Sequence, residues 1–281
     1  MGTKFSRYRI EAGSKVDLDN LDPEDDAAFD GDKDEAYARL DEIRDDIAEL
    51  QEKLFAQNEN KLLVVLQAMD TAGKDSTIRD VFKETSPNGV HTFSFGRPSV
   101  EELAHDYLWR VHQHAPAKGQ IHIFNRSHYE DVLVVRVNEL VPEKVWKRRY
   151  DHIRNFEQML ADEGTTILKF FLHISKDEQR QRLQERVDEP EKNWKFDHGD
   201  LPVRARWNQY MSAYEDAIER TTTDDAPWYI IPADHKLYTH AIIGNIITET
   251  LEKMNLQIPQ PTQEDLDLLQ KGKKELEAEE D

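Results

Sequence analysis

Residues 61–77 read KLLVVLQAMDTAGKDST, and this segment sets the interpretation of the whole chain. Its first part, 61–67, is a continuous apolar run, which is typical of a strand buried on both faces of a parallel sheet. A loop of small and polar residues follows, and residues 74–84 have the pattern of a helix. We therefore expect a strand, a phosphate-binding loop and a helix, in that order.

The loop matches the phosphate-loop pattern G-x-x-x-x-G-K-[ST] only in part. Gly73 and Lys74 are in register, but Ala68 replaces the first glycine and Asp75 replaces the Ser or Thr. Unpaired N–H groups at a helix start bind phosphate, Gly73 allows a close approach, and Lys74 adds a full positive charge. Gly-Lys after a strand is by itself often an ordinary turn; the buried strand and the small residues favour phosphate binding. The other candidate phosphate contacts are Thr71, Ala72 and Ser76.

Two carboxylates in this loop are candidate metal ligands. Mg²⁺ prefers a few carboxylates together with phosphate oxygens, and Asp70 and Asp75 could supply them, with Mn²⁺ as a substitute ion. For Asp70 we favour this interpretation. Asp75 has an equally good alternative as a helix cap or an acid placed favourably in the first turn.

A second polar cluster follows the apolar run 120–124. Ligands of open α/β sheets bind at the carboxyl ends of the strands, so this cluster is expected to lie near the loop. Arg126 suits bidentate phosphate contact. Asn125 stands where a Walker B strand ends in Asp, and its amide brings no charge to a metal ion. Glu130 or Asp131 could supply that charge.

The same residues also have a structural interpretation. Ser127 and Glu130 fit the capping-box pattern S-x-x-E, so they could simply cap the next helix. Both interpretations can hold together, although capping leaves Arg126 unexplained.

Strand and helix patterns alternate along the chain, which predicts an α/β fold with a doubly wound parallel sheet flanked by helices. Further strands are expected at 91–95, 120–124, 166–174 and 228–232. Helices are expected at 33–57, 74–84, 99–113, 142–161, 175–187, 200–220 and 236–253. The segment 188–204 interrupts the pattern in the position of a lid. The predicted organisation is an irregular acidic arm at 1–32, a core domain at 33–257 with a lid at about 176–206, and an acidic tail at 258–281, expected to be mobile with room for a short helix.

The chain has 281 residues, no cysteine and a formal net charge of −20. Residues 17–35 hold ten acids and one lysine, and residues 263–281 hold eight acids and three lysines. We expect these to be solvated surfaces, and a chain this acidic is not expected to bind nucleic acid. No apolar run approaches the roughly 20 residues of a membrane span, and residues 1–17 have no apolar signal region. We expect a cytoplasmic protein.

Four segments together resemble the polyphosphate kinase 2 family. They are QAMDTAGKD (67–75), FNRSHYEDVLVVRV (124–137), PEKNWKF (190–196) and APWYIIPADHKLY (226–238). The likeness is to the class-III-like members, which phosphorylate AMP and ADP from polyphosphate. It implies a thymidylate-kinase-like P-loop fold with a helical lid, a Mg²⁺ requirement, ATP regeneration as an activity and a homo-oligomer.

The resemblance also implies roles for individual residues. It places Asp70, Gly73 and Lys74 in the Walker A segment, and Asn125 and Arg126 in the Walker B segment. Asn125 matches the pattern of members that use both AMP and ADP, whereas ADP-restricted members have Asp there. The nucleotide contacts that it suggests are Arg97, His105, Asp106 and Arg110.

The resemblance gives the predicted lid two arginines and two lysines. Arg182 and Arg186 match the family's paired lid arginines, and Lys192 and Lys195 fall in the segment that follows. The arginines are four residues apart on one helix face, where two cations repel and favour an anion. The alternative partners are acids of the same region: Glu185, Asp188 and Glu189.

The expected reaction is transfer of the terminal phosphoryl group of polyphosphate to AMP and ADP, giving ADP and ATP. Two alternatives stay open at this point. One is an ATP-dependent nucleoside or nucleotide kinase on the same fold. The other is a non-catalytic phosphate-binding module, which the incomplete Walker motifs favour slightly and the set of Asp, Lys and Arg residues opposes.

Overall fold

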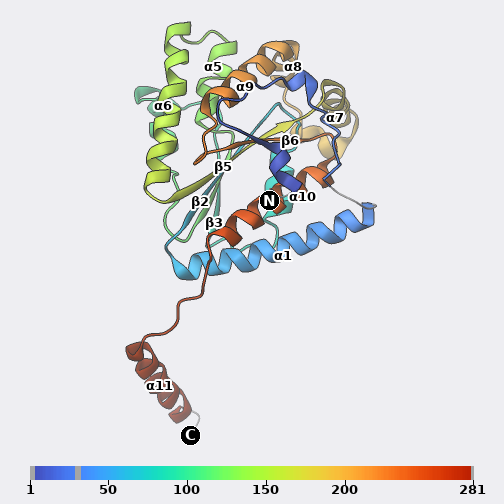
Figure 1. Cartoon of the computed structure of the whole chain (residues 1–281). Coiled ribbons are helices and arrows are strands. Elements are labelled where there is room, and N and C mark those ends of the chain that lie inside the picture. The colour runs from blue at the N-terminus through green and yellow to red at the C-terminus, as the bar shows by residue number, and fades with distance from the viewer. Residues whose placement is uncertain (1–3, 29–32, 280–281) are drawn as a thin grey trace.

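The computed structural model describes residues 4–28 and 33–279, and its centre is a six-stranded sheet (Figure 1). The strand order is β1-β6-β5-β2-β4-β3. Five strands are parallel, and β1 is antiparallel to β6. The strands are β1 Arg9–Ile10, β2 Lys61–Ala68, β3 Val90–Ser94, β4 Ile121–Asn125, β5 Thr165–His173 and β6 Trp228–Pro232. The predicted α/β fold class is confirmed.

The first core strand, β2, lies in the middle of the sheet between β4 and β5. Six of its residues from Leu62 to Gln67 are almost completely buried, as the apolar run predicts. The chain winds from β2 to one side of the sheet and later to the other. Ligands bind at the carboxyl ends of the strands near such a switch point. The loop after β2 therefore stands at the favoured place for a ligand.

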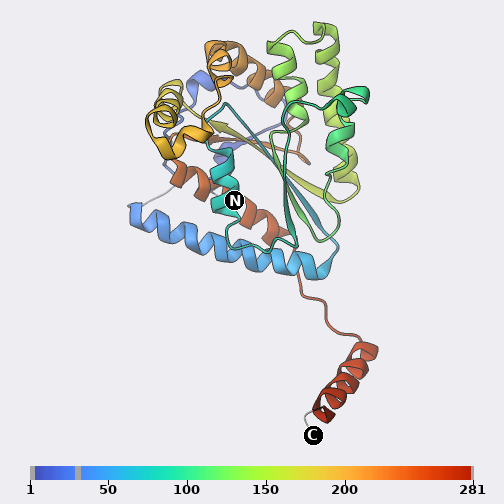
Figure 2. The same cartoon turned by 180° about the vertical axis from the view of Figure 1, so that it is seen from behind.

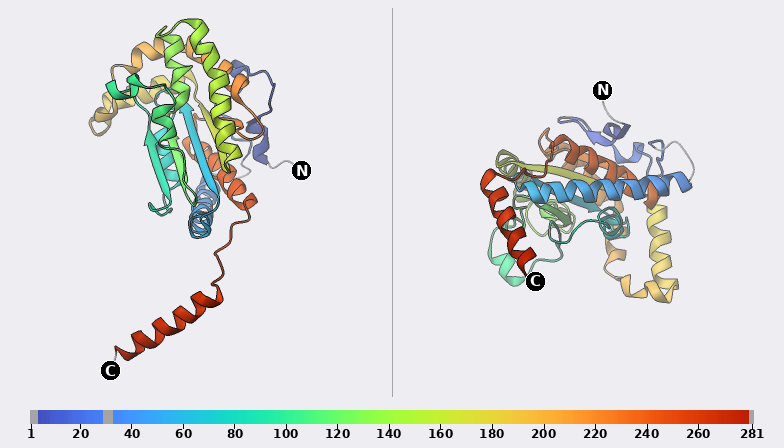
Figure 3. Two further views of the ribbon diagram at one scale, coloured as in Figure 1. Left: turned by 90° about the vertical axis from the view of Figure 1, so that its left-hand side faces the viewer. Right: turned by 90° about the horizontal axis from the view of Figure 1, so that it is seen from below.

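Helices cover both faces of the sheet (Figures 2 and 3). The helices are α1 Lys33–Gln57, α2 Lys74–Val81, α3 Val100–Ala104, α4 Trp109–His112, α5 Val134–Val137, α6 Glu143–Asp162, α7 Lys176–Asp188, α8 Asp200–Ala205, α9 Trp207–Thr221, α10 Lys236–Lys253 and α11 Gln263–Ala278. Helices α1, α2 and α10 pack together, and α6 packs against α9 and β5. Where α1 and α10 cross, a Cβ on Gly244 would lie 2.5 Å from Ile43, so this close approach requires glycine.

Two predicted helices are each divided in the structure. The helix expected at 99–113 is α3 and α4, with a break at 105–108. Ser99 and Glu102 form a capping box at the start of α3, and the Asp106 carboxylate accepts from the Leu108 N–H. Such a side-chain bond competes with helix hydrogen bonding, so it interrupts the helix and precedes the start of α4. The helix expected at 200–220 is likewise divided at Arg206 into α8 and α9.

The N-terminal segment is more ordered than predicted. It holds β1 and two 3-10 turns, Lys4–Tyr8 and Leu18–Asn20, and the side chains of Tyr8, Val16 and Leu18 are buried in the core. The segment 29–32 of the expected arm lies outside the described residues. At the other end, α11 extends away from the sheet (Figures 1 and 2). The predicted domain boundaries stay predictions.

In the part of the chain that the structure describes, no helix is both long enough and apolar enough to cross a membrane.

Candidate functional site

The loop after β2 encloses the ammonium group of Lys74. This side chain is buried, and its Nζ donates to the carbonyl oxygens of Ala68 at 3.1 Å and Met69 at 3.4 Å. Gly73 has a φ of +107°, a left-handed conformation that glycine adopts without strain. Burial lowers the pKa of Lys74, and the charge of Arg126 adds to this effect. The charges of Asp70, Glu130 and Asp75 oppose the lowering. A buried ammonium group among these residues favours an anionic ligand.

The ends of β2 and β4 bring four predicted site residues together in two pairs. Arg126 Nη2 donates to Asp70 Oδ1 at 2.7 Å, and Asn125 Nδ2 donates to Asp75 Oδ1 at 2.7 Å. Arg126 has a φ of +60°, an unusual conformation for a residue with a side chain. Its side chain remains 41% exposed, so the guanidinium is accessible to a ligand.

The two adjacent carboxylates after β4 have different surroundings. Burial raises the pKa of Glu130, and the charges of Arg126 and Lys74 partly offset that rise, so Glu130 faces the loop. Asp131 instead accepts from Arg149 Nη1 at 2.8 Å. Asp131 lines a recess with Arg110 and Arg149, whose charges act on it, whereas the charges of Lys74 and Arg126 act on Glu130. This location does not fit the metal role predicted for Asp131 at the loop.

Among residues 4–28 and 33–279, no group of three or more His, Cys, Asp or Glu side chains could hold a metal ion. The structure therefore offers no complete protein cage for a metal. Mg²⁺ usually keeps several waters and takes one or two carboxylates together with substrate phosphates. Asp70 and Glu130 fit this second mode, because their charges interact and both face Lys74.

Arg182 is placed differently from the anion-binding lid arginine that the resemblance implies. It is buried and donates to four groups in its surroundings. Its acceptors are the Glu178 carboxylate and the carbonyl oxygens of Thr71, Ala233 and Asp234, at 2.7 to 3.1 Å. Arg182 therefore braces the phosphate loop against the end of β6, and these bonds do not fit its predicted contact with the transferring phosphate.

Arg186, one turn further along α7, lies within the predicted lid. Its Nη1 donates to the carbonyl oxygen of Lys195 at 3.0 Å and to Asp200 Oδ2 at 3.3 Å. Asp200 is close enough to Asp70 for that negative charge to affect its pKa. Arg186 is therefore connected to the loop through Asp200, whose pKa is affected by both Asp70 and Arg186.

The predicted lid lysines contact other residues of the lid. Lys192 Nζ lies 3.2 Å from the Glu185 carboxylate and 2.8 Å from that of Glu189. Lys195 Nζ lies 5.1 Å from the ring centre of Trp194, whose side chain is exposed. Neither lysine makes a contact with the loop in this arrangement.

A recess of about 680 Å³ opens between the α3–α4 segment and the first half of α6. Asp106 and Arg110, both predicted, line it, and Arg110 Nη1 donates to the Gly96 carbonyl oxygen at 2.9 Å. Arg97, also predicted, is exposed and lies outside the lining. His105 lies in the lining and stacks on the ring of Trp109.

Sequence reasoning missed three cations of this recess. Lys144, Arg148 and Arg149 line it from α6, and Arg149 also lies over the ring of Tyr107, 4.5 Å from its centre. The available signal was the basic run 147–149 in an otherwise acidic chain, with Lys144 and Arg148 four residues apart on one helix face.

A central parallel strand, a loop that encloses a lysine, and an arginine from the neighbouring strand are typical of enzymes that transfer phosphoryl groups. A family model described as polyphosphate kinase 2 matches residues 30–259. The chain belongs to the polyphosphate kinase 2 family and is a kinase.

Known proteins of this family are similar over almost the whole chain. The AMP/ADP-polyphosphate phosphotransferase of Meiothermus ruber is 58% identical, over 92% of this chain and 96% of the relative. The ADP-polyphosphate phosphotransferase of Rhodopseudomonas palustris is 43% identical, over 93% and 94%. The crystal structure of polyphosphate kinase 2 from Arthrobacter aurescens superposes with a TM-score of 0.89 at 41% identity, covering 92% of each chain.

Proposed function

We propose that this enzyme transfers the terminal phosphoryl group of inorganic polyphosphate to AMP and to ADP, giving ADP and ATP. The observation that supports it most directly is the convergence of Lys74, Arg126 and Asp70 at the ends of two neighbouring strands. The similarity to an enzyme named for both acceptors adds the substrate class. Regeneration of ATP from AMP would follow from two successive transfers.

In the proposed reaction, an oxygen of the nucleotide phosphate attacks the terminal phosphorus of polyphosphate in line with the leaving phosphate. Lys74 and the N–H groups at the start of α2 hold phosphate oxygens, while Arg126 and Arg186 neutralise charge as it spreads in the loose transition state. The attacking phosphate is already ionised, so no strong base is required.

Magnesium, with manganese as a substitute, is the proposed cofactor. Asp70 and Glu130 would hold it together with phosphate oxygens and waters, and the ion would neutralise phosphate charge. Asp70 also accepts from Arg126 in the structure, so this carboxylate would orient the arginine beside the same phosphate.

We place the acceptor nucleotide in the recess beside α6. Arg148 and Lys144 contribute positive charge there, and Tyr107 contributes an aromatic surface. The recess lies on the side of β3 and β4, whereas the loop lies at β2, so an acceptor phosphate pointing towards Arg126 would meet the donor between the two. A homo-oligomer, a P-loop mode of donor binding and a cytoplasmic location stay predictions.

Product analysis tests the proposed function. With AMP, excess polyphosphate and Mg²⁺, ADP should rise first and ATP should follow. The same assay with ATP in place of polyphosphate tests an ATP-dependent kinase. No metal-dependent turnover with either donor would indicate a phosphate-binding module and would contradict the proposal.

Changing Asn125 to Asp should depress the AMP step more than the ADP step. The wild-type amide donates to Asp75 at 2.7 Å, so the variant places two carboxylates against each other where the acceptor phosphate must settle. AMP and ADP differ in length by one phosphate, so their reacting oxygens meet the donor only if the acceptor shifts by about one phosphate unit. Added charge or a recruited metal ion would favour one of these two acceptor positions. Initial rates with each acceptor measure the effect.

A charge-exchanged control distinguishes an effect of charge at position 125 from simple repulsion between the carboxylates at positions 125 and 75. The double variant Asn125→Asp/Asp75→Asn restores one amide and one carboxylate at the same two positions. If acceptor choice depends on charge at position 125, the double variant should remain selective for ADP. If it recovers both steps equally, or if Asn125→Asp lowers both steps equally, the link between Asn125 and acceptor choice is wrong.

Polyphosphate should bind more tightly as the pH falls through about 6. Burial raises the pKa of Asp200 to about 6, and the charge of Asp70 adds to the rise while Arg186 opposes it. Above that pH, Asp200 is charged, holds Arg186 and repels phosphate. Below it, Asp200 is neutral and releases the arginine. Bound polyphosphate favours the protonated form of Asp200, so binding takes up protons. The Kd for polyphosphate should therefore fall roughly three- to tenfold between pH 7.5 and 5.5.

Two matched variants in the predicted lid test this pH dependence. Asp200→Asn should bind tightly at pH 7.5 and lose most of the pH dependence. Asp188→Asn is the control, since Asp188 is exposed and accepts from Gln184 on its own helix. A pH dependence that is unchanged in Asp200→Asn would show that another group titrates.

A further inference from the structure

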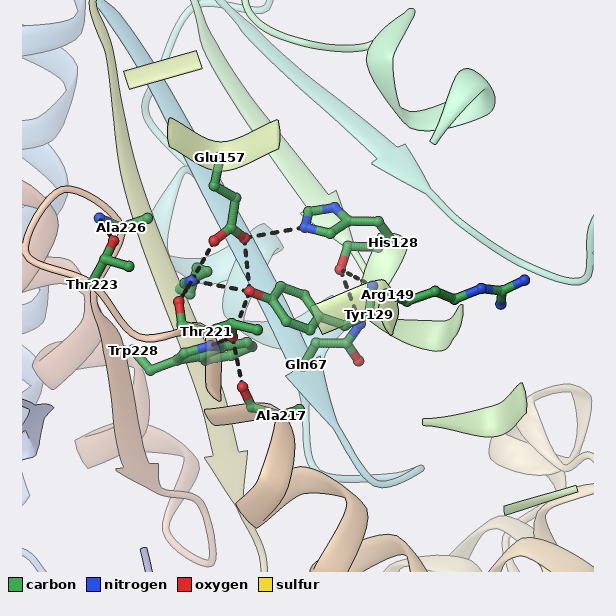
Figure 4. A network of polar contacts seen from close by, with 12 residues as sticks. Gln67, His128, Tyr129, Arg149, Glu157, Ala217, Thr221, Thr223, Ala226 and Trp228 are labelled. Atoms are coloured by element: carbon green, nitrogen blue, oxygen red, sulfur yellow. Dashed lines mark hydrogen bonds and ion pairs between the residues drawn. The ribbon is translucent and has the colours of Figure 1, made fainter. Parts of the chain in front are cut away.

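A buried polar cluster surrounds His128 and Tyr129, which follow Arg126 by two and three residues along the chain (Figure 4). At its centre is the hydroxyl of Tyr129, which receives a hydrogen bond from Lys169 Nζ at 3.0 Å and lies 2.8 Å from Glu157 Oε1 and 2.9 Å from Thr221 Oγ1. His128 Nε2 lies 3.1 Å from the same Glu157 oxygen. We call these five residues the Tyr129 cluster.

The Tyr129 cluster joins four parts of the fold. Its side chains converge from the 3-10 turn His128–Asp131, from α6, from β5 and from the end of α9 (Figure 4). Lys169 uses all three of its donors, on the Glu157 carboxylate at 2.6 Å, the Tyr129 hydroxyl, and the Thr221 carbonyl oxygen at 2.8 Å. The cluster is therefore held in one geometry.

Stability alone does not account for these buried charges. Lys169 is 0% exposed and Glu157 is 2% exposed. Burial lowers the pKa of Lys169, although Glu157 opposes the change. Burial alone would raise the pKa of Glu157, but the charge of Lys169 and the hydrogen bond with His128 lower it, so the carboxylate depends on these partners for its charge. Well-packed apolar residues often replace a buried ion pair with no loss of stability. We therefore expect the buried ion pair to hold neighbouring backbone in a precise position.

The Tyr129 cluster positions the backbone that follows Arg126. Ser127, His128 and Tyr129 are all 0% exposed. Ser127 Oγ accepts from Gln67 Nε2 at 3.1 Å, which ties the turn to β2, and the Arg126 N–H donates to the Leu66 carbonyl oxygen at 3.0 Å.

Arg126 itself is strained, with a φ of +60°. A side-chain-bearing residue keeps such a conformation only where its surroundings hold it. This conformation accompanies the 2.7 Å contact between Arg126 and Asp70.

We infer that Tyr129, Lys169 and Glu157 are positioning residues for phosphoryl transfer. They fix the turn after β4 so that Arg126 keeps its left-handed conformation and directs its guanidinium to the phosphate site. This inference rests on the proposed function. None of the three is proposed to touch substrate; they act through Arg126.

The test begins with Tyr129→Phe, which keeps the ring and removes the central hydroxyl. We expect kcat to fall roughly tenfold, because small displacements of a phosphate-contacting group are costly. The Kd for inorganic triphosphate, measured by calorimetry, should rise about threefold. The deciding measurement repeats the change in an Arg126→Ala background, where both effects should vanish, because the group through which Tyr129 acts is already absent.

Two controls separate positioning from loss of stability. Tyr150→Phe removes the hydroxyl of another buried tyrosine, one that accepts from Arg136 at 3.4 Å and does not contact the turn. Ile247→Val, in the core on α10, lowers the melting temperature without touching the cluster. Both should leave kcat and the Kd for triphosphate near the wild-type values.

The inference is overturned if Tyr129→Phe has wild-type kcat and triphosphate affinity, or if its losses are equally large in the Arg126→Ala background. It is also overturned if Ile247→Val, at a matched melting temperature, reproduces them. Calorimetry does not depend on turnover. If the wild type fails to use polyphosphate, the proposed function falls, and the binding cycle still decides the role of the Tyr129 cluster.

Discussion

Changing Lys74 to Ala should lower kcat/KM roughly a thousandfold while the chain still folds. Such a loss corresponds to about 4 kcal/mol of transition-state stabilisation. The reason is geometric: Lys74 Nζ is held inside the loop by the carbonyl oxygens of Ala68 and Met69, where a donor phosphate would meet both the cation and the N–H groups of α2. Water cannot easily substitute for a buried, fixed charge.

The same substitution should not destabilise the protein in the absence of phosphate. Burial lowers the pKa of Lys74, so the charged form is less favourable in the folded chain than in the unfolded one. Removing it should leave the melting temperature unchanged or higher. Added polyphosphate should raise the melting temperature of the wild type but hardly that of Lys74→Ala.

Arg79→Met is the matched control for this experiment. Arg79 lies on the same helix, α2, but its side chain is 66% exposed and pairs with Asp80. This variant should keep turnover and the stabilisation by polyphosphate. If Lys74→Ala is soluble, folded and nearly fully active, the loop is not the donor site.

The fold could be predicted where one strong local signal decides the structure. Helix α10 and strand β6 have the expected bounds, because α10 has a long apolar helical pattern and β6 is a short apolar run that ends at Pro232. Strand β1 was missed because its register, Arg9 with Tyr229, joins residues far apart in sequence. Two residues carry too weak a pattern to indicate such a pairing.

The site residues likewise include some that local sequence could place and others whose partners are distant in the sequence. Gly73 and Lys74 follow a buried strand and begin a helix, so local sequence was enough to place them at the loop. Arg182 could not be distinguished from Arg186 as an anion-binding lid arginine, because its role depends on carbonyl groups contributed by Thr71 and Ala233. Asp131 likewise carried no sign of its partner Arg149, which lies 18 residues away on a helix face that other cations share.

Changing Asp70 to Asn should lower kcat/KM about a hundredfold and weaken the dependence on Mg²⁺. Asparagine has nearly the same shape, and its Oδ1 can still accept the hydrogen bond that Arg126 makes at 2.7 Å. The position of Arg126 is therefore largely kept, and the loss reports the missing negative charge. The measurement is the rate as a function of Mg²⁺ concentration at saturating polyphosphate, where half-saturation should move to higher Mg²⁺.

Asp75→Asn is the control that makes this result specific to the metal. Asp75 lies five residues further on, in the first turn of α2, and is also an aspartate, but its carboxylate accepts from Asn125, and an amide at position 75 can still do so. This variant should keep the wild-type Mg²⁺ dependence. If instead Asp70→Asn is nearly silent and Asp75→Asn shifts the Mg²⁺ curve, the metal lies on the other side of the loop. Arg126 would then hold Asp70 as an ordinary ion pair, and Asp75 would replace it as the carboxylate that meets the bridging ion.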